Sequence, residues 1–276
     1  MNDSSVGPYD APIGVFDSGL GGLTVLQAIR SRLPSESTVY LGDSARIPYG
    51  PKSPDTIQRY SREAAVFLAA QGVKAIVVAC NTATSVALED IRSESGLPVL
   101  GVIEPGAQAA AAVSVGGRIG VIGTAGTIAS GAYERAIRDM RPEAVVLAQA
   151  CPLFVPLVEE GWTEGQVPRL AAEAYLEPLL EERMDTLVLA CTHYPLLADL
   201  LEGVVGPGVQ LVNSAQATAA SLTSLLKETG LAASPEAAPE VRYFVTDEAA
   251  RFSLLARRLL GERVENLTRV SVDSTV

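Results

Sequence analysis

The sequence predicts an α/β protein built from two similar α/β domains with mainly parallel sheets, related by a pseudo-twofold axis with a cleft between them. Short apolar, β-branched runs alternate with longer segments of helical pattern, which is typical of parallel sheets covered by helices. The runs are too apolar to leave one face of a sheet in water, as expected for parallel strands. Two stretches of the chain also recur at nearly one spacing, which indicates a duplicated unit.

The predicted strands and helices alternate along the chain. Apolar runs predict strands at residues 13–16, 38–41, 76–79, 99–102, 118–122, 144–147, 186–190 and 209–212. Helical patterns between them predict helices at residues 22–32, 54–70, 83–93, 131–140, 167–182 and 215–228. A helix that returns the chain between two parallel strands is the repeating unit of such a fold.

The duplication rests on two matched pairs of stretches. Residues 13–18, Ile-Gly-Val-Phe-Asp-Ser, resemble residues 119–124, Ile-Gly-Val-Ile-Gly-Thr, 106 positions later. Residues 77–82, Val-Val-Ala-Cys-Asn-Thr, resemble residues 188–193, Val-Leu-Ala-Cys-Thr-His, 111 positions later. Each half is therefore expected to have a first strand that ends in a small polar turn and a later strand that ends in a cysteine.

The repeat also predicts the domain boundaries. Because the second copy runs out near residue 208, we expect residues 101–208 to form the second domain. Residues 1–100 form the first, together with 209–276, whose apolar segments must pack back on it. Open parallel sheets bind ligands outside the carboxyl ends of their strands, so residues at these ends should face one cleft. They are Asp17, Ser18, Cys80, Thr124 and Cys191.

Composition restricts the class of function. The chain has 276 residues, of which 48% are hydrophobic and 19% charged, enough apolar material for a sizeable core. A formal net charge of −11 gives no electrostatic help in binding nucleic acid or anionic lipid, so we expect neither as a partner. The charge does not argue against a small anionic substrate, because a site can be rich in N–H donors while the surface is acidic.

Several features predict a cytoplasmic protein with reduced thiols. Residues 1–12 are polar and lack a basic start followed by an apolar run, so no signal peptide is expected. No window approaches about 20 uninterrupted apolar residues, so no membrane span is expected. Three cysteines, an odd number, do not resemble a secreted disulfide framework.

The sequence predicts no metal and no organic cofactor. The single histidine, His193, argues against a multi-histidine metal site within one chain. A pyridoxal phosphate enzyme needs a lysine for its Schiff base, and the three lysines, Lys52, Lys74 and Lys227, do not lie in stretches typical of a cofactor site. No phosphate-binding or dinucleotide-binding glycine motif is present.

Cys80 and Cys191 are the groups predicted to carry the chemistry. Each follows an apolar strand, precedes a small polar pair and stands where a helical pattern begins. The pairs are Asn81-Thr82 and Thr192-His193. Free amides at a helix N-terminus stabilise a thiolate, so we expect the pKa of each thiol to fall below the free value of about 8.5. The same amides can hold a substrate carboxylate.

Two matched thiols favour one reaction over its alternatives. A lone cysteine at a strand end is usually a small buried hydrophobe, and Cys151, which has no repeat partner, is interpreted in that way. Acid–base groups on opposite faces of a small molecule can remove a proton from a carbon stereocentre and return one from the far side. Asp17 could then assist one thiol and His193 the other.

Two other classes of thiol chemistry remain open. A thiol hydrolase needs one nucleophile, one base and an oxyanion hole, which leaves the second cysteine without a role. A redox pair would need Cα atoms within about 7 Å of each other, which is too close for thiols on opposite faces of a substrate. The symmetry of the two cysteines therefore favours inversion of a stereocentre.

Several stretches resemble one known family. They are residues 14–25, 42–50, 79–84, 123–127, 151–161 and 189–196. They make the chain, from about residue 12 to residue 215, similar to the glutamate racemases of the cofactor-independent aspartate/glutamate racemase family. The resemblance implies interconversion of L- and D-glutamate, which supplies D-glutamate for peptidoglycan, without pyridoxal phosphate or metal.

By the same resemblance, Cys80 and Cys191 are the two opposed catalytic bases. Supporting acid–base groups would be Asp17, His193, Asp43 and Glu159. The substrate site would be lined by Asp17, Ser18, Pro48, Tyr49, Gly50, Asn81, Thr82, Thr124, Thr127, Thr192 and His193. The family fold has two α/β domains and a C-terminal segment that returns to the first. Family members are often homodimers and some inhibit DNA gyrase, so a homodimer is expected and gyrase is an untested partner.

The chain departs from the family pattern at Asn213, where an aspartate is common. This puts a carboxylate role there in doubt and leaves the cysteine chemistry untouched. Residues 1–10 lie outside the match and are expected to be flexible. A racemase of the same superfamily acting on aspartate or hydantoins remains an alternative. A regulatory binding protein without catalysis is another, against which the intact cysteines argue.

Overall fold

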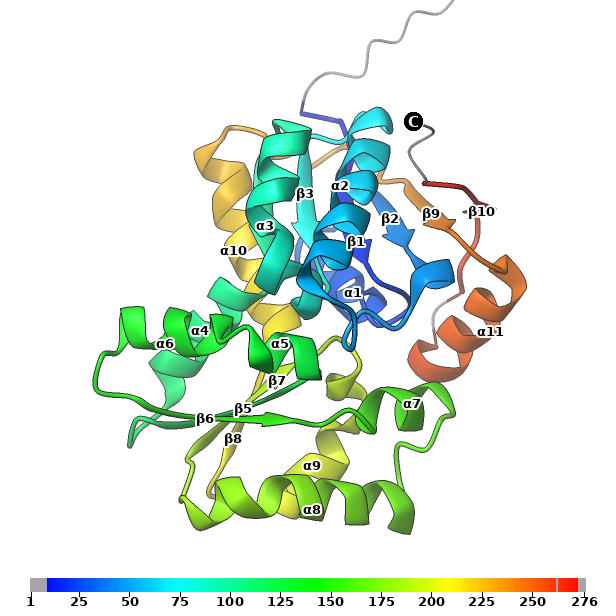
Figure 1. Ribbon diagram of the computed structural model, residues 1–276. Helices are drawn as coiled ribbons and strands as arrows, with labels where there is room; N and C mark the ends of the chain where they lie inside the picture. The colour runs from blue at the N-terminus through cyan, green and yellow to red at the C-terminus, as the bar shows by residue number, and fades with distance from the viewer. Residues whose placement is uncertain (1–8, 262, 273–276) are drawn as a thin grey trace, which may run out of the picture.

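The computed structural model describes residues 9–261 and 263–272, and these form two α/β halves, one above the other in Figure 1. The expectations for the N-terminal start fall mostly on residues 1–8, which lie outside the described residues. Every pair of neighbouring strands in the described sheets is parallel. The predicted fold class, two α/β units with parallel sheets, is confirmed.

The first half contains a six-stranded sheet in the order β10-β9-β2-β1-β3-β4. Its strands are β1 (Ile13–Asp17), β2 (Thr38–Gly42), β3 (Ala75–Val78), β4 (Val99–Gly101), β9 (Val241–Val245) and β10 (Leu267–Arg269). The second half contains a four-stranded sheet in the order β6-β5-β7-β8. Its strands are β5 (Arg118–Gly123), β6 (Val145–Ala150), β7 (Thr186–Ala190) and β8 (Gln210–Asn213).

The two sheets repeat one topology. The order β2-β1-β3-β4 matches β6-β5-β7-β8 strand for strand, with β1 and β5 in corresponding inner positions. The repeated sequences fall on corresponding strands, because residues 13–18 and 119–124 run along β1 and β5. The cysteine-containing repeats likewise run along and past β3 and β7. The duplication read from the sequence is therefore a duplication of structure.

Helices cover both faces of both sheets. They are α1 (Leu23–Arg32), α2 (Pro54–Ala70), α3 (Asn81–Ser95), α4 (Ile103–Val113), α5 (Ala125–Ala129), α6 (Ala132–Met140), α7 (Phe154–Glu159), α8 (Gln166–Glu181), α9 (Ala198–Val205), α10 (Ser214–Glu228) and α11 (Ala249–Leu260). Short 3₁₀ helices span Ser44–Arg46 and Tyr194–Leu197. Separate apolar clusters lie on the two faces of each sheet, so the inner strands β1, β2, β3, β5 and β7 are buried on both sides.

Local chemistry explains where several helices begin. The Ser53 side chain accepts a hydrogen bond from the Thr56 N–H and Pro54 occupies the first turn, which starts α2.

The helices α4 and α7 are absent from the elements predicted from the sequence. Pro105 and Pro156 each stand third in these helices, a first-turn position where the missing N–H of proline removes no helical hydrogen bond.

The C-terminal segment returns to the first half. β9 pairs with β2, and β10 pairs with β9, which extends the first sheet (Figure 1). The domain boundaries at residues 100 and 208 stay a prediction. Because β8 pairs with β7 and not with the first sheet, we propose moving the second boundary to the end of β8. Within the described residues, no helix has the length and apolar character needed to cross a bilayer.

A buried ion pair fixes one end of the first sheet. Lys74 Nζ lies 2.6 Å from Glu36 Oε2, and both side chains are almost fully buried. Lys74 also donates to the Tyr9 carbonyl oxygen at 2.6 Å, and Glu36 accepts from the Ala233 N–H at 2.8 Å. The pair therefore ties the loop before β9 and the start of the described chain to the strand edge.

We expect Lys74→Met to lower the free energy of unfolding by about 3–5 kcal/mol, because it leaves the Glu36 carboxylate buried without its cation. Urea denaturation followed by circular dichroism measures this. Lys227→Met, at an exposed lysine of α10, is the control and should change stability by less than about 0.5 kcal/mol. A loss below about 1 kcal/mol in Lys74→Met would show that the pair contributes little.

Candidate active site

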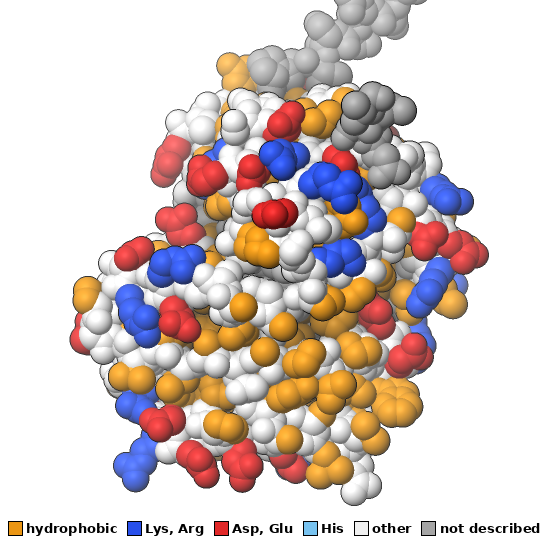
Figure 2. Space-filling model, viewed as in Figure 1, with side chains coloured by type: hydrophobic (Ala, Val, Ile, Leu, Met, Phe, Trp, Pro, Cys, Tyr) orange, Lys and Arg blue, Asp and Glu red, His pale blue; other side chains and the backbone are white. Residues whose placement is uncertain are grey.

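A cavity of about 380 Å³ lies where the two halves meet. Hydrophobic side chains gather near this junction on the face shown in Figure 2. The cavity is lined by Ser18, Gly19, Ile47, Pro48, Tyr49, Gly50, Pro51, Cys80, Asn81, Thr82, Thr124, Ala125, Pro152, Val155, Pro156, Glu159, Cys191, Thr192 and His193. Both predicted cysteines are among these residues, one from each half. Asp17, Asp43 and Thr127 are the predicted site residues that do not line it.

Cys80 occupies the N-cap position of α3, just past β3. Its Sγ lies 3.5 Å from Ser18 Oγ, and the residue is 5% exposed. The expected low pKa is wrong for this thiol. Burial raises the pKa of Cys80 to about 12, with a further rise from the negative charge of Asp17, and these effects exceed the opposing hydrogen bonds from Ser18 and the Ala83 N–H at the helix start. Cys80 is therefore a neutral thiol at neutral pH.

Cys191 follows β7 and faces the only histidine of the chain. Its Sγ lies 4.0 Å from His193 Nδ1, and His193 Nε2 lies 3.3 Å from Glu159 Oε1 at the end of α7. Burial alone would lower the pKa of His193. Hydrogen bonds with Cys191 and Glu159, together with their negative charges, raise that pKa to about 10. The imidazole is therefore protonated at neutral pH and stands between the Cys191 sulfur and the Glu159 carboxylate.

The surroundings of Cys80 and of Cys191, the two half-sites of the cavity, differ at positions that correspond in the repeat. Thr82 is two residues after Cys80. Its hydroxyl oxygen lies 2.9 Å from Thr124 Oγ1 and 3.2 Å from Thr127 Oγ1, both of which belong to the second half. The corresponding residue after Cys191 is His193, and the position corresponding to Thr127 is Gly21. A Cβ at Gly21 would come within 2.6 Å of His193 Nδ1. The contact between the Thr82 and Thr127 hydroxyls around Cys80 is thus replaced around Cys191 by the His193 imidazole against Gly21.

Asp17 lies beneath the cavity and is fully buried. Its Oδ2 accepts the Gly19 N–H at 2.9 Å, whereas Oδ1 has no hydrogen-bond partner among the described residues. Burial raises the pKa of Asp17, and the nearby positive charge of His193 opposes that rise. Asp17 therefore does not line the cavity, and its expected acid–base and substrate-binding roles stay predictions.

Asp43 is also fully buried, behind the loop that carries Tyr49. Its carboxylate accepts hydrogen bonds from the Tyr49 hydroxyl and, at 2.9 Å, from Thr246 Oγ1. It also pairs with Arg46 at 2.8 Å. The structure therefore places Asp43 where it anchors Tyr49, and its expected acid–base role stays a prediction without a route to the cavity.

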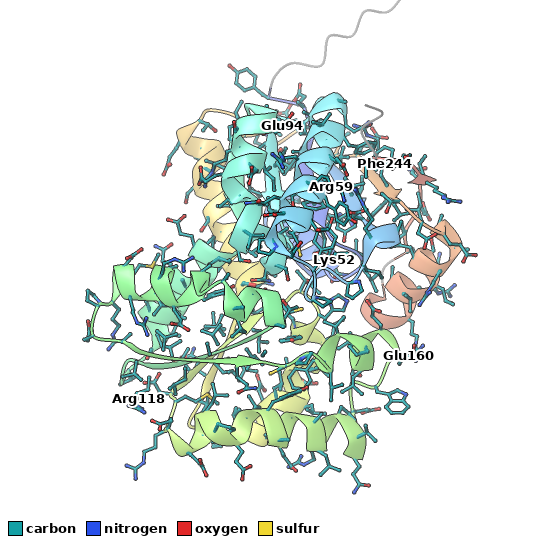
Figure 3. All side chains as sticks on the ribbon, in the orientation of Figure 1. Lys52, Arg59, Glu94, Arg118, Glu160 and Phe244 are labelled. Carbon is teal, nitrogen blue, oxygen red and sulfur yellow. The ribbon has the colours of Figure 1, made fainter. Side chains whose placement is uncertain are left out.

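The cavity lining includes residues that the sequence did not single out. Gly19, Ile47 and Pro51 come from the first half, and Ala125, Pro152, Val155 and Pro156 come from the second. Apart from Gly19, these are apolar side chains without chemistry of their own. The matched stretches contain all of them except Pro51, for which the sequence carries no signal. Lys52, labelled between the halves in Figure 3, donates to the Pro48 carbonyl oxygen at 2.9 Å.

Asn213, where the chain departs from the family pattern, caps α10. Its Oδ1 accepts the Ala215 N–H at 2.9 Å, and the residue does not line the cavity. An asparagine oxygen performs this capping as well as an aspartate oxygen does. The substitution therefore preserves the helix start.

Comparison with known proteins fixes the family. The model of the Asp/Glu/Hydantoin racemase family matches residues 21–222. The chain belongs to this family. Glutamate racemase from Geobacter metallireducens is 50% identical over 267 residues, which cover 97% of this chain and 98% of that protein. Glutamate racemase from Syntrophus aciditrophicus is 49% identical over 272 residues, 99% of this chain and 100% of that protein.

Solved structures of family members have the same fold. Glutamate racemase isoform RacE1 from Bacillus anthracis superposes with a TM-score of 0.91 at 40% identity, over 95% of this chain and 97% of that chain. Glutamate racemase from Francisella tularensis, in complex with D-glutamate, gives a TM-score of 0.90 at 37% identity, over 96% of this chain and 99% of that chain. The chain is therefore an isomerase of the amino-acid racemase class, as predicted.

The single histidine makes the acid–base state of the site directly measurable. We expect the Cε1 proton of His193 to titrate near pH 10 in one-dimensional NMR, because Cys191 and Glu159 stabilise the imidazolium. Glu159→Gln should move the midpoint down toward the ordinary value of about 6.5. Because the pKa of His193 is raised in the folded state, the charged imidazole also stabilises the fold. This contribution to the free energy of unfolding is fully present below about pH 6.5 and is lost as the pH rises through about 10.

Glu160→Gln is the matched control for this titration. Glu160 is the next residue along the chain and is exposed, and Figure 3 labels it at the rim of the molecule beyond α7. Its replacement should leave the His193 midpoint unchanged. A wild-type midpoint near 6.5, or equal shifts in both variants, would contradict the pairing of His193 with Glu159.

Proposed function

We propose that the protein interconverts L- and D-glutamate by a two-base proton transfer, in which Cys80 and Cys191 act on opposite faces of the substrate Cα. The observation that supports this most is the placement of two buried cysteines, one from each half of a duplicated fold, on one cavity. The relatives support glutamate as the substrate, because those at 37–50% identity are glutamate racemases over nearly the whole chain.

The chemistry needs one thiolate and one thiol. The thiolate takes the Cα proton, and the electron pair of the broken C–H bond moves into the adjacent carboxylate. The other thiol then gives its proton to the opposite face of the planar carbon and becomes the thiolate. Atoms and charge balance without an external acid, base or oxidant, and the product is the mirror image of the substrate.

The surroundings of the thiols support unequal starting roles. Cys80 is held neutral by burial, with a pKa of about 12, so it begins as the proton donor. Cys191 lies beside His193, which is protonated at neutral pH. Since the reaction needs one base and Cys80 begins as the donor, Cys191 is the proposed base. Ser18, Asn81, Thr82, Thr124 and Thr192 supply donors for the two carboxylates of glutamate.

Proton NMR of L-glutamate in D₂O tests the proposal with purified protein and no added cofactor or metal. Loss of the Cα–H signal, together with formation of D-glutamate on a chiral column, is the expected result. No exchange by well-folded protein would remove glutamate as the substrate. The same assay with aspartate and with a hydantoin would then test the alternatives within the family.

We also propose that the enzyme works in the cytoplasm as a homodimer and supplies D-glutamate for peptidoglycan. Large apolar side chains at Leu153, Trp162, Val167 and Leu170 are each more than half exposed, which supports a partner on that surface. Light scattering after gel filtration should give twice the chain mass. Growth of a bacterial strain that requires D-glutamate, restored by this gene and not by a Cys80→Ala copy, tests the role in supply.

A further inference from the structure

Asn81 is a buried amide whose two polar atoms have unequal partners. The residue is 2% exposed and lines the cavity as the first residue of α3. Its Oδ1 accepts a hydrogen bond from the Tyr133 hydroxyl at 2.8 Å, whereas Nδ2 has no partner among the described residues. A buried N–H group without an acceptor is unfavourable. An acceptor that enters the cavity with the substrate removes that penalty.

Tyr133 reaches Asn81 from the other half of the molecule. It lies in α6, is 3% exposed and does not line the cavity. Its hydroxyl stands in a space that Gly106 leaves open, because a Cβ at Gly106 would come within 3.0 Å of Tyr133 Oη and 3.2 Å of Ser214 Cβ. The hydroxyl is thus enclosed by α3, α4 and the start of α10, and it has little freedom to turn away from Asn81.

The hydroxyl is a donor at any pH at which the enzyme works. Burial raises the pKa of Tyr133, and a hydrogen bond with Ser214 opposes this only in part. A protonated phenol that donates to an amide oxygen fixes which end of the amide is the oxygen. Without it, the side chain of Asn81 can rotate by half a turn and present its oxygen to a substrate carboxylate, which is repulsive.

We propose that Tyr133 is a positioning residue for substrate binding, which holds the Asn81 amide with its N–H groups free for a carboxylate oxygen of the substrate. This inference rests on the proposed glutamate racemase function. It adds a residue outside the cavity wall that acts only through Asn81. It also makes the site depend on contact between the halves, since Tyr133 and Asn81 lie in different ones.

The test is steady-state racemisation of glutamate by wild type, Tyr133→Phe, Asn81→Ala and the double variant. Tyr133→Phe keeps the ring and removes only the hydroxyl. We expect KM to rise about 10- to 100-fold, the effect of one hydrogen bond to a charged group, with kcat changed less than about threefold. In the Asn81→Ala background, Tyr133→Phe should change KM by less than about twofold, because the amide it positions is gone.

Tyr243→Phe is the matched control, because Tyr243 is equally buried at 3% and lies in β9, outside the cavity lining. It should leave KM unchanged. Should Tyr133→Phe not fold, Gly106→Ala gives a second perturbation of the same hydroxyl and should also raise KM.

A wild-type KM in folded Tyr133→Phe would overturn the inference. So would an effect of Tyr133→Phe on KM that is equal in the presence and absence of Asn81. In either case, racemisation by the wild type would still sustain the proposed function. No racemisation by the wild type would remove both together.

Discussion

Replacing Cys191 with serine should lower kcat/KM for glutamate by about 10²–10⁴-fold, the range that one positioned acid–base group contributes. A serine hydroxyl is a far weaker acid than a thiol and cannot exchange a proton with Cα at a useful rate. Cys80→Ser should have an effect of the same order. Because two enantiomers have equal free energy in water, each variant must lose kcat/KM equally in the two directions.

Hydrogen exchange at Cα needs only one base, so it shows on which face of the substrate each thiol acts. In D₂O, Cys191→Ser should still exchange the Cα–H of one enantiomer through Cys80 without inverting it, and Cys80→Ser should do so for the other enantiomer. Cys151→Ser is the control, since Cys151 is buried, does not line the cavity and has only a weak contact with the Gln149 carbonyl oxygen at 3.7 Å. Inversion at the wild-type rate in either cysteine variant would exclude the two-thiol mechanism.

The parts of this protein that could be predicted from sequence are those that depend on local pattern. The strands are continuous apolar runs, and the repeat correctly matched β1 to β5 and Cys80 to Cys191 as corresponding positions of the two halves. A thiol just past an apolar strand and just before a helix stands at the carboxyl end of a sheet in any such fold. Both cysteines consequently reached the cavity as expected.

The remaining features depend on tertiary packing that no local pattern reveals. The helix start beside Cys80 is visible in the sequence, and it does lower the pKa, but burial and the charge of Asp17 outweigh it. Asp43 stands in a matched stretch, yet the loop folds so that Tyr49 comes between it and the cavity. Tyr133 touches Asn81 from 52 positions away, and a lone tyrosine on a helix gives no indication of that contact.

The asymmetry between the half-sites leads to the second large effect. Gly21→Ala should lower kcat/KM by about 10²-fold, because the new methyl group would lie 2.3 Å from Thr192 Oγ1 and 2.6 Å from His193 Nδ1. Both side chains are buried, at 7% and 6% exposure, so they cannot move aside without displacing Cys191 or Glu159. Overpacking of this kind should also reduce the free energy of unfolding by about 1–3 kcal/mol.

Gly208→Ala is the control for the effect of a methyl group on a glycine, because nothing lies within 4 Å of a Cβ at that position and its backbone is not in the left-handed region. It should leave activity and stability within error of the wild type. The titration of His193 in Gly21→Ala separates the causes. A midpoint displaced from that of the wild type would mean that the imidazole has left Cys191 or Glu159, whereas an unchanged midpoint with lost activity would place the damage at Thr192. Wild-type activity would mean that the imidazole does not need the space that glycine leaves, and that the two half-sites differ for another reason.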